Sequence, residues 1–422
     1  MDFDTIVIGA GVAGLTAARE LSGAGKRVCV IEARERIGGR IFTIRDTRQP
    51  LPVELGAEFI HGEAEETFAI VDAAALLAYQ LPDAHVWSRR GRLQPIGDLW
   101  GQIARIRSRI GDGPDRSFAD FVKSQRSLTP RQRELALSFV EGYHAAHADR
   151  ISAKALQVSD DEQDPSTNKQ FRIGSGYDSL VAWLNAGLDP DRSTVHLGTS
   201  VTDASWRKGH VSIRTSRGDK LSASSAVITI PIGVLKAPMG QPGAIRFTPE
   251  LRAKQRAIAH LEIGHVVKIV FTFRERFWDE SLNFVHANDP FISVWWTTAP
   301  VRTATLTAWT GGHAADRLLA ENRELRIDRA LQSLANTFAT KRSKIDDLFV
   351  SSHTHDWQAD PFSRGAYSYA GVGGSRAPKE LAKALDSTLF FAGEATNGKE
   401  TGTVSGAIAS GKRAAREVLR SR

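Results

Sequence analysis

The sequence predicts an α/β protein of two domains, and three observations favour this fold class. The chain has 422 residues, which at about 150 residues per domain is enough for two or three domains. Residues 5–8 form an apolar run, a glycine cluster and an amphipathic stretch follow, and 27–31 form a second apolar run. This order is typical of a strand, a tight turn, a helix and a second strand. The last 50 residues repeat its first three parts, with an apolar strand at 389–392, a glycine-rich turn and a helix, so we expect both ends of the chain to share one domain.

Between the two ends the pattern changes along the chain. Residues 67–192 are mostly helical in pattern, with breaks at proline and glycine. Residues 195–231 favour strands, because apolar and polar side chains alternate there and Pro231 ends the last run. Further strands are expected over 266–273 and within 291–310, and a helical stretch follows the last of them.

The composition excludes several classes of protein. Lys and Arg number 55 and Asp and Glu 48, a net charge of +7 with no block of like charges, so a nucleic-acid surface is not expected. Cys29 is the only cysteine, which excludes an intramolecular disulfide and a cysteine-rich zinc site. No apolar run reaches the ~18–20 residues that a membrane span requires, and no basic leader precedes the first strand. We therefore expect a cytoplasmic protein without membrane contact; a homodimer is compatible with the sequence.

A glycine-rich turn follows the first predicted strand. Residues 9–14, Gly-Ala-Gly-Val-Ala-Gly, fit the pattern G-x-G-x-x-G. Gly9 permits the tight turn, Gly11 lets the backbone approach a pyrophosphate, and Gly14 lets helix and strand pack closely. Glu32 ends the second strand, where an acid accepts hydrogen bonds from a ribose. An ordinary glycine-rich turn is the alternative, but this context favours a bound dinucleotide.

A second glycine turn, at 38–40, comes soon after Glu32 and ends in Arg40. Paired glycines permit close approach of the backbone, and the arginine can neutralise a phosphate or bind the carbonyl edge of a flavin. The alternative is a surface turn with a solvated arginine.

Six separated motifs span nearly the whole chain. In chain order they are the turn at 9–14 with Glu32 and 38–40; 55–62; 226–231, preceded by Val201; Lys268 within 266–270, followed by Phe277 and Trp278; Trp357 with 365–368; and 391–396 with 402–407. Together they resemble the flavin-dependent amine oxidase family, which includes monoamine oxidases, polyamine oxidases and lysine-specific histone demethylases.

The resemblance implies a fold with two parts. One is a discontinuous Rossmann-type FAD-binding domain, similar to that of glutathione reductase, over 1–78, 195–245 and 375–422. The other is a mixed α+β substrate-binding domain over 79–194 and 246–374.

The resemblance also implies the reaction, FAD-dependent oxidation of a polyamine or another primary or secondary amine. Hydride transfer from the α-carbon to flavin N5 would give an imine, which water hydrolyses to an aldehyde. Molecular oxygen would reoxidise the flavin and yield hydrogen peroxide. Ala366 stands where monoamine oxidases attach the flavin through cysteine, so non-covalent FAD is expected.

Five residues are assigned to catalysis by the resemblance. Lys268, the only charge in an apolar strand, would hold a water against flavin N5, although such a lysine is more often a side chain that reaches solvent. Tyr367 would form one wall of an aromatic cage, with a core aromatic as the alternative. Thr403 stands at the second wall, where monoamine oxidases have tyrosine. Trp357 would pack beside the flavin ring, and His61 would face the substrate.

The same motifs assign residues to the cofactor. Glu394 would contact its ribityl or pyrophosphate region, and the helix that begins at Thr403 would direct its N-terminus at the flavin ring. The whole set is Gly9, Gly11, Ala13, Gly14, Glu32, Ala33, Arg34, Gly39, Arg40, Gly56, Ala57, Glu58, Phe59, Val201, Trp357, Gly393, Glu394, Thr403 and Val404.

Other residues are weaker candidates for the substrate cavity. They include Tyr177, Trp295 and Trp296, and alternation along a strand lets only one of the two tryptophans face a cavity. A polyamine would need carboxylates along its path, and the candidates are Glu63, Glu65, Glu66 and the acidic run 160–164. A solvated charge run is the alternative for the last of these.

Two histidine pairs have a spacing that suits a metal ion, namely His144 with His147 and His353 with His355. The sequence places no third ligand beside either pair, so no metal site is expected.

Other functions compete with amine oxidation. A flavin desaturase or oxidase for an apolar polycycle or polyene would not need Lys268 or Tyr367. An L-amino acid oxidase would place an arginine after the flavin-lining Gly-Ala, where this chain has Glu58, Phe59 and Ile60. A histone demethylase would need a helical arm or a histone-binding domain, for which 422 residues leave no room. A flavin-binding scaffold without activity is a further alternative.

Overall fold

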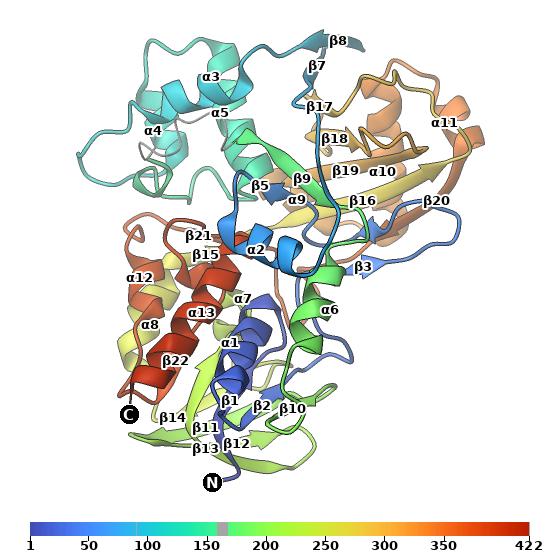
Figure 1. The fold of residues 1–422 in the computed structure, drawn as a ribbon. Helices are drawn as coiled ribbons and strands as arrows, with labels where there is room; N and C mark the ends of the chain where they lie inside the picture. The colour runs from blue at the N-terminus through green and yellow to red at the C-terminus, as the bar shows by residue number, and fades with distance from the viewer. Residues whose placement is uncertain (90, 158–167, 422) are drawn as a thin grey trace.

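A computed structural model describes residues 1–89, 91–157 and 168–421, and it shows the expected α/β class. Figure 1 shows one sheet in the lower half of the molecule and a second in the upper half, with a group of helices beside the second. Both chain termini lie at the lower end. Within the described residues, no helix is long and apolar enough to cross a membrane.

The lower sheet has eight strands and brings the two ends of the chain together. Its spatial order is β10 (Ser193–His196), β2 (Val28–Ile31), β1 (Phe3–Ile8), β13 (Lys220–Ile228), β12 (His210–Thr215), β11 (Val201–Arg207) and β14 (Arg246–Thr248), with β22 (Leu389–Phe391) paired to β13. Strand β1 is parallel to β2 and to β13, and β22 is parallel to β13. The central strands are buried on both faces, which explains their continuous apolar runs.

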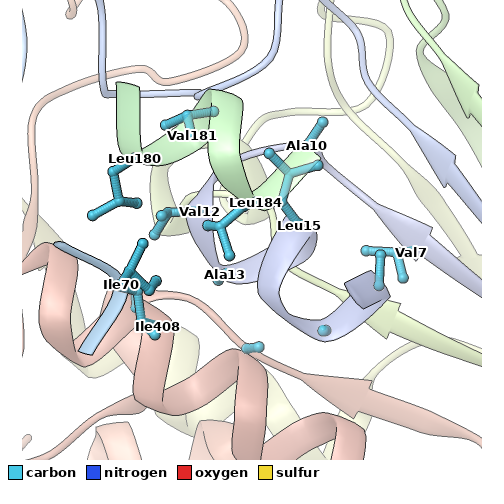
Figure 2. Packing of buried hydrophobic residues seen from close by; sticks show 14 of the residues in the cluster. Val7, Ala10, Val12, Ala13, Leu15, Ile70, Leu180, Val181, Leu184 and Ile408 are labelled. Atoms are coloured by element: carbon cyan, nitrogen blue, oxygen red, sulfur yellow. The ribbon is translucent and has the colours of Figure 1, made fainter. Parts of the chain in front are cut away.

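Helices cover this sheet and the space between the two sheets. Their bounds are α1 (Val12–Gly23), α2 (Glu65–Ala73), α6 (Asp178–Ala186), α7 (Ile232–Leu235), α8 (Arg252–His260), α12 (Ala377–Ala382) and α13 (Val404–Arg420). Figure 2 shows the core between α1, α6 and α13, where Leu15, Val181 and Ile408 are buried. A Cβ at Gly411 would lie 2.4 Å from the carbonyl oxygen of Ala13, so α13 approaches α1 as closely as only glycine permits.

The upper sheet has seven strands. Its order is β20 (Phe349–Thr354), β16 (Val266–Phe273), β19 (Thr305–Gly311), β18 (Val294–Thr297), β17 (Phe284–Ala287), β7 (His85–Arg89) and β8 (Arg92–Pro95). One face packs on α9 (Gly312–Leu319), α10 (Arg323–Thr337) and α11 (Arg342–Leu348), where Phe271, Trp295 and Leu334 share one buried core.

A helical lobe and three small sheets complete the fold. The lobe consists of α3 (Leu99–Arg107), α4 (Phe118–Ser124) and α5 (Pro130–Tyr143), which share buried contacts. The small sheets pair β5 (Ile60–His61), β9 (Gln170–Ile173) and β6 (Ala78–Gln80); β3 (Thr43–Ile44) and β4 (Val53–Glu54); and β15 (Leu261–Ile263) and β21 (Ser368–Ala370).

The predicted elements agree with the structure at the ends of the chain and differ in 67–192. The strand expected over 266–273 is β16, with the same bounds. The helical interpretation of 67–192 is wrong in part, because β6, β7, β8 and β9 lie in it. Their residues are largely polar, and β7 pairs with β17 far along the chain, a partner that local periodicity does not reveal.

The division into two domains stays a prediction, and the packing leads us to propose different boundaries. Helix α6 packs in the core of the lower sheet, and β14 is one of its strands. Leu251, which precedes α8, and Ala257, which lies in α8, are also buried in a core of this sheet. We therefore propose that about 170–192 and 246–263 belong with the dinucleotide-binding part.

Candidate active site

One cavity of about 430 Å³ is lined by residues of both sheets, the helical lobe and the start of α13. Every residue that the sequence assigned to catalysis or to the cofactor lines this cavity except Gly14. Tyr177 and Trp296 line it as well, whereas Trp295 lies in the core on the other face of the sheet. The expectation that only one of the two tryptophans faces the cavity is therefore confirmed.

The first glycine turn has the shape that a dinucleotide needs. A Cβ at Gly14 would lie 1.9 Å from the carbonyl oxygen of Gly9, so Gly14 packs the helix onto the turn and has no room to line the cavity. A Cβ at Gly11 would meet open space, which leaves its backbone accessible to a pyrophosphate. The Ala10 amide donates to Glu32 Oε2 at 2.8 Å, which fixes this buried carboxylate at the end of β2.

Arg40 and Glu394 form an ion pair at the cavity wall, with 2.8 Å between Arg40 Nη1 and Glu394 Oε1. Glu394 also accepts from Ser368 Oγ at 2.7 Å and from the Gly402 amide at 3.1 Å. Both carboxylate oxygens thus have donors within the protein. Glu394 therefore holds Arg40 and the start of β21 in place, an arrangement that the sequence did not indicate.

A buried charge cluster is formed by Glu58, Arg172, Lys268 and Trp296, of which all but Arg172 line the cavity. Glu58 Oε2 is 2.6 Å from Lys268 Nζ, and Glu58 Oε1 is 2.6 Å from an Arg172 guanidinium nitrogen. Trp296 Nε1 donates to Glu58 Oε1 at 3.1 Å. Burial raises the pKa of Glu58, but Lys268 and Arg172 outweigh burial and hold this pKa below its usual value. The charge cluster thus contains one anion and two cations.

Lys268 is fixed by two acceptors. Its Nζ donates to the Gly56 carbonyl oxygen at 3.1 Å and pairs with Glu58. An ammonium has three N–H donors, and within the described residues the third has no protein acceptor. Because Lys268 is 3% exposed and lines the cavity, this third donor is available to a water or a ligand there.

The two walls of the expected cage are built differently. The Tyr367 hydroxyl donates to the Tyr143 carbonyl oxygen at 2.6 Å, which fixes its ring, and burial raises its pKa. The Thr403 hydroxyl accepts from the Gly406 amide at 2.9 Å and donates to the Glu400 carbonyl oxygen at 2.8 Å. Thr403 is thus the N-cap of α13, and its hydroxyl is engaged in the cap.

Rings line much of the remaining cavity, which we call the aromatic region. It consists of Phe59, Trp100, Phe139, Tyr143, Phe284, Trp296 and Trp309 with His61, His85, His144 and His286. Burial lowers the pKa of His61 to about 4. The pKa of His144 and that of His286 are lowered to about 3, mainly by burial and to a smaller extent by Arg107 and by His85, respectively. These three rings are therefore neutral at pH 7.

The buried histidines predict a loss of stability in acid. An unfolded histidine has a pKa near 6.5, so between about pH 6.5 and 4 the unfolded chain binds more protons than the folded one. Stability therefore falls as the pH falls through this window. His144 Nε2 has no hydrogen-bond partner among the described residues. Between pH 7 and pH 4.5, the unfolding free energy of the His144→Phe variant is therefore expected to fall by about 2–3 kcal/mol less than that of the parent.

Denaturant unfolding of both proteins at the two pH values measures this difference. An equal acid loss in the two proteins would show that His144 does not titrate with a depressed pKa.

Three of the carboxylates proposed for a polyamine, Glu63, Glu65 and Glu66, do not line the cavity. Glu63 and Glu65 line a separate shallow depression, and Glu66 pairs with Lys412 at 2.5 Å. They lie on and beside α2, whose acidic side chains point to its outer surface, so that proposal is wrong for these three. The acidic run 160–164 lies outside the described residues. Glu400 does line the cavity, and its half-buried carboxylate has no ion pair or hydrogen bond with another described residue.

Several residues of the site were not predicted from the sequence, namely Arg172, which pairs with Glu58 without lining the cavity, and Trp100 and Trp309, which line it. Arg172 was missed because its strand lies in the stretch interpreted as helical; a single arginine between Phe171 and Ile173 was the available signal. Trp309, whose Nε1 donates to the Gly142 carbonyl oxygen at 2.7 Å, and Trp100 reach the cavity from distant segments. No local pattern marks such residues.

Comparison with known proteins agrees with this geometry. The family model described as flavin containing amine oxidoreductase matches residues 12–419. Polyamine oxidase 3 of Oryza sativa subsp. japonica is 31% identical over 98% of this chain and 88% of its own length, and polyamine oxidase 2 of Arabidopsis thaliana is 31% identical over 98% and 87%. The solved structure of wild-type putrescine oxidase bound to putrescine covers 99% of each chain with a TM-score of 0.83 at 20% identity.

These matches confirm the expected fold class, the flavin cofactor FAD and the oxidation of an amine, and they do not favour the desaturase or L-amino acid oxidase alternatives. The family match covers nearly the whole described chain, from the end of the first glycine turn to residue 419 in α13, and it includes the second glycine turn and the charge cluster. The chain belongs to the flavin-containing amine oxidoreductase family.

Proposed function

We propose that this amine oxidase acts on a monoamine whose apolar or aromatic body lies in the aromatic region. The charge cluster carries the proposal. Its two cations, Lys268 and Arg172, exceed its one anion, Glu58, and three rings of the aromatic region, His61, His144 and His286, are neutral at pH 7. A second ammonium on the substrate would meet net positive charge beside this cluster, and among the described residues only Glu400 offers a cavity carboxylate without an ion pair.

The residues present fit FAD as the resident group. Gly11 leaves space for the pyrophosphate, Glu32 is placed for the ribose, and Arg40 lies at the wall where Glu394 holds it. The N-terminus of α13 offers backbone N–H groups and its dipole to the ring edge. When bound, the flavin accepts the hydride that leaves the α-carbon of the amine.

The protein's own residues prepare the amine. The rings of the aromatic region exclude water and disfavour an ammonium ion, so the substrate nitrogen binds in its neutral form. Tyr367, fixed through its hydroxyl, orients the nitrogen. Lys268 holds a water with its third N–H and supplies or accepts a proton at Nζ. His61 and Trp357 shape the walls of this space.

Polyamine oxidation is a second candidate, and one observation favours it. Glu400 lines the cavity with a carboxylate that no other described residue neutralises, and a distal ammonium would pair with it. The names of the two plant relatives agree with this candidate.

A panel of amines distinguishes the two candidates. Under anaerobic conditions, benzylamine and 2-phenylethylamine are expected to bleach the bound flavin faster than putrescine and spermidine. If a polyamine depends on a charge-assisted pair with Glu400, its KM should rise about 10- to 100-fold in the Glu400→Gln variant. The KM of each monoamine should change by less than about twofold. Glu63→Gln, which removes a carboxylate outside the cavity, is the control.

The monoamine proposal would be overturned in favour of a polyamine if putrescine or spermidine bleached the flavin faster than the monoamines and if their KM rose in the Glu400→Gln variant. A flavin that no amine reduces would contradict both.

We further propose molecular oxygen as the acceptor and a non-covalent FAD. Ala366 lines the cavity with no nucleophile to bond the ring, which supports the second point. A cytoplasmic location is proposed from the single cysteine, Cys29, which is buried and free. A homodimer stays a prediction.

A further inference from the structure

Three segments bring two imidazoles and a carboxylate together outside the cavity. His147 follows α5, His265 precedes β16, and Asp316 lies on α9. Asp316 Oδ2 is 2.7 Å from His147 Nε2, and Asp316 Oδ1 is 2.5 Å from His265 Nδ1. The three ligand atoms lie within 4.8 Å of one another. The His147 side chain is buried, with 2% of its surface exposed, whereas the Asp316 side chain is 40% exposed.

Two histidines beside Asp316, His147 and His313, have a further partner on their other ring nitrogen. His147 Nδ1 is 3.2 Å from the Tyr369 hydroxyl. A third ring, His313, directs Nδ1 toward Asp316 Oδ2 at 3.8 Å, while its Nε2 is 3.0 Å from Asp149 Oδ1. One nitrogen toward a common centre, with the other held by a hydroxyl or carboxylate, is the arrangement of metal-bound histidines.

We propose that His147, His265 and Asp316 bind one divalent transition metal ion, with Zn²⁺ as the best fit and His313 as the fourth ligand. Neutral imidazole and carboxylate suit Zn²⁺, which takes four such ligands in a tetrahedron. With Zn–N and Zn–O distances of about 2.0–2.1 Å, ligand atoms stand about 3.3 Å apart. The Asp316 oxygens now lie 2.7 Å and 2.5 Å from the histidine nitrogens. A shift of the Asp316 carboxylate by less than about 1 Å would bring these distances to the separation of two zinc ligands.

A proton-held cluster is the competing arrangement. In it, His147 and His265 each donate an N–H to one oxygen of Asp316, and the cluster is satisfied without an ion. A metal ion would displace those two protons, so its affinity must fall as the pH falls. The sequence pairs considered earlier did not reveal this site, because only His147 of them takes part and its partners lie on other segments.

The site would connect the helical lobe to the strand that carries Lys268. His265 stands three positions before Lys268, His147 follows the cavity residue His144, and Tyr369 belongs to β21. The three ligands do not line the cavity. A bound ion therefore holds the lobe against β16 without touching substrate or flavin, so the proposal is independent of the proposed function.

The test uses the flavin-loaded enzyme after treatment with a chelator and dialysis. Zn²⁺ is titrated against a chromophoric competitor, and bound metal is counted by elemental analysis. We expect one Zn²⁺ per chain, weaker binding at pH 5.5 than at pH 7.5, and a rise in Tm of a few degrees at an excess of about 100-fold over Kd. The visible flavin spectrum should not change.

Variants and a direct measurement complete the test. Asp316→Asn and His265→Gln are expected to weaken Zn²⁺ binding at least tenfold, whereas His353→Gln should not. His353 is a suitable control because it forms an equivalent pair with Asp46, at 2.9 Å, outside the cluster. X-ray absorption of the parent enzyme with Zn²⁺ reports the imidazole ligands without any substitution.

The proposal is overturned if no stoichiometric Zn²⁺ is retained at 100 µM (on the order of a weak adventitious affinity). It is equally overturned if Asp316→Asn and His353→Gln bind Zn²⁺ alike, or if the absorption spectrum shows no imidazole ligands.

Discussion

The Lys268→Met variant is expected to react with oxygen about 10²- to 10⁴-fold more slowly than the parent after its flavin has been reduced by an amine. Lys268 is the only charge of β16 that faces the cavity, and Gly56 and Glu58 fix its Nζ so that one N–H remains for a water. Methionine fills the same space and supplies no proton. Stopped-flow mixing of the anaerobically reduced enzyme with oxygenated buffer measures the rate at about 450 nm, where oxidised flavin absorbs.

Lys254→Met provides a matched control for this experiment. Lys254 is also buried, at 1% exposure, and its Nζ donates to the Glu380 and Lys383 carbonyl oxygens away from the cavity. Its loss removes a buried ammonium of the same kind without altering the cavity. Equal oxygen reactivity of Lys268→Met and the parent would show that Lys268 has a structural role only.

The Glu58→Gln variant is expected to lose about 3–5 kcal/mol of unfolding free energy. Without its carboxylate, the ammonium of Lys268 and the guanidinium of Arg172 are left buried beside each other. Arg172 retains hydrogen bonds to the carbonyl oxygen of Thr297 at 3.0 Å and to that of Ala299 at 3.4 Å, and neither acceptor carries a full negative charge. Denaturant unfolding at pH 7, followed by circular dichroism and by release of flavin, measures the loss.

A second substitution tests the electrostatic origin of that loss. Adding Arg172→Met to Glu58→Gln removes one of the unpaired cations and should recover part of the stability, so the two effects are not additive. Glu63→Gln, at an exposed position, should change stability by less than about 0.5 kcal/mol. A loss in Glu58→Gln as small as that of Glu63→Gln would mean that the ion pairs contribute little.

Contiguous motifs account for what the sequence predicted well. The turn at 9–14, Glu32 and β16 depend on spacing within one segment, and the structure places them as expected. Local spacing reports strand, turn and helix directly, because each of these elements is decided by neighbours a few residues away.

The residues that were missed depend on contacts between distant segments. The carboxylate of Glu58 was assigned to the cofactor because it follows the Gly-Ala of the flavin-lining motif, yet its partners Arg172 and Lys268 lie far along the chain. The pKa of Glu58 is set by burial and by two neighbouring cations, and no pattern within residues 55–62 indicates these neighbours. The same reason explains why Glu400 was overlooked and Glu66, which binds Lys412, was proposed instead.

The pairing of β22 with β13 and the close contact of α13 with α1 have a consequence for biosynthesis. The first glycine turn leaves the ribosome about 380 residues (389 − 9) before β22 does, an interval of roughly 20–80 s at ~5–20 residues per second. During that time α1 can pack against β1, β2 and α6, but it lacks its contact with α13. Insertion of the cofactor therefore belongs to a late stage of folding, after β22 and the start of α13 have been made.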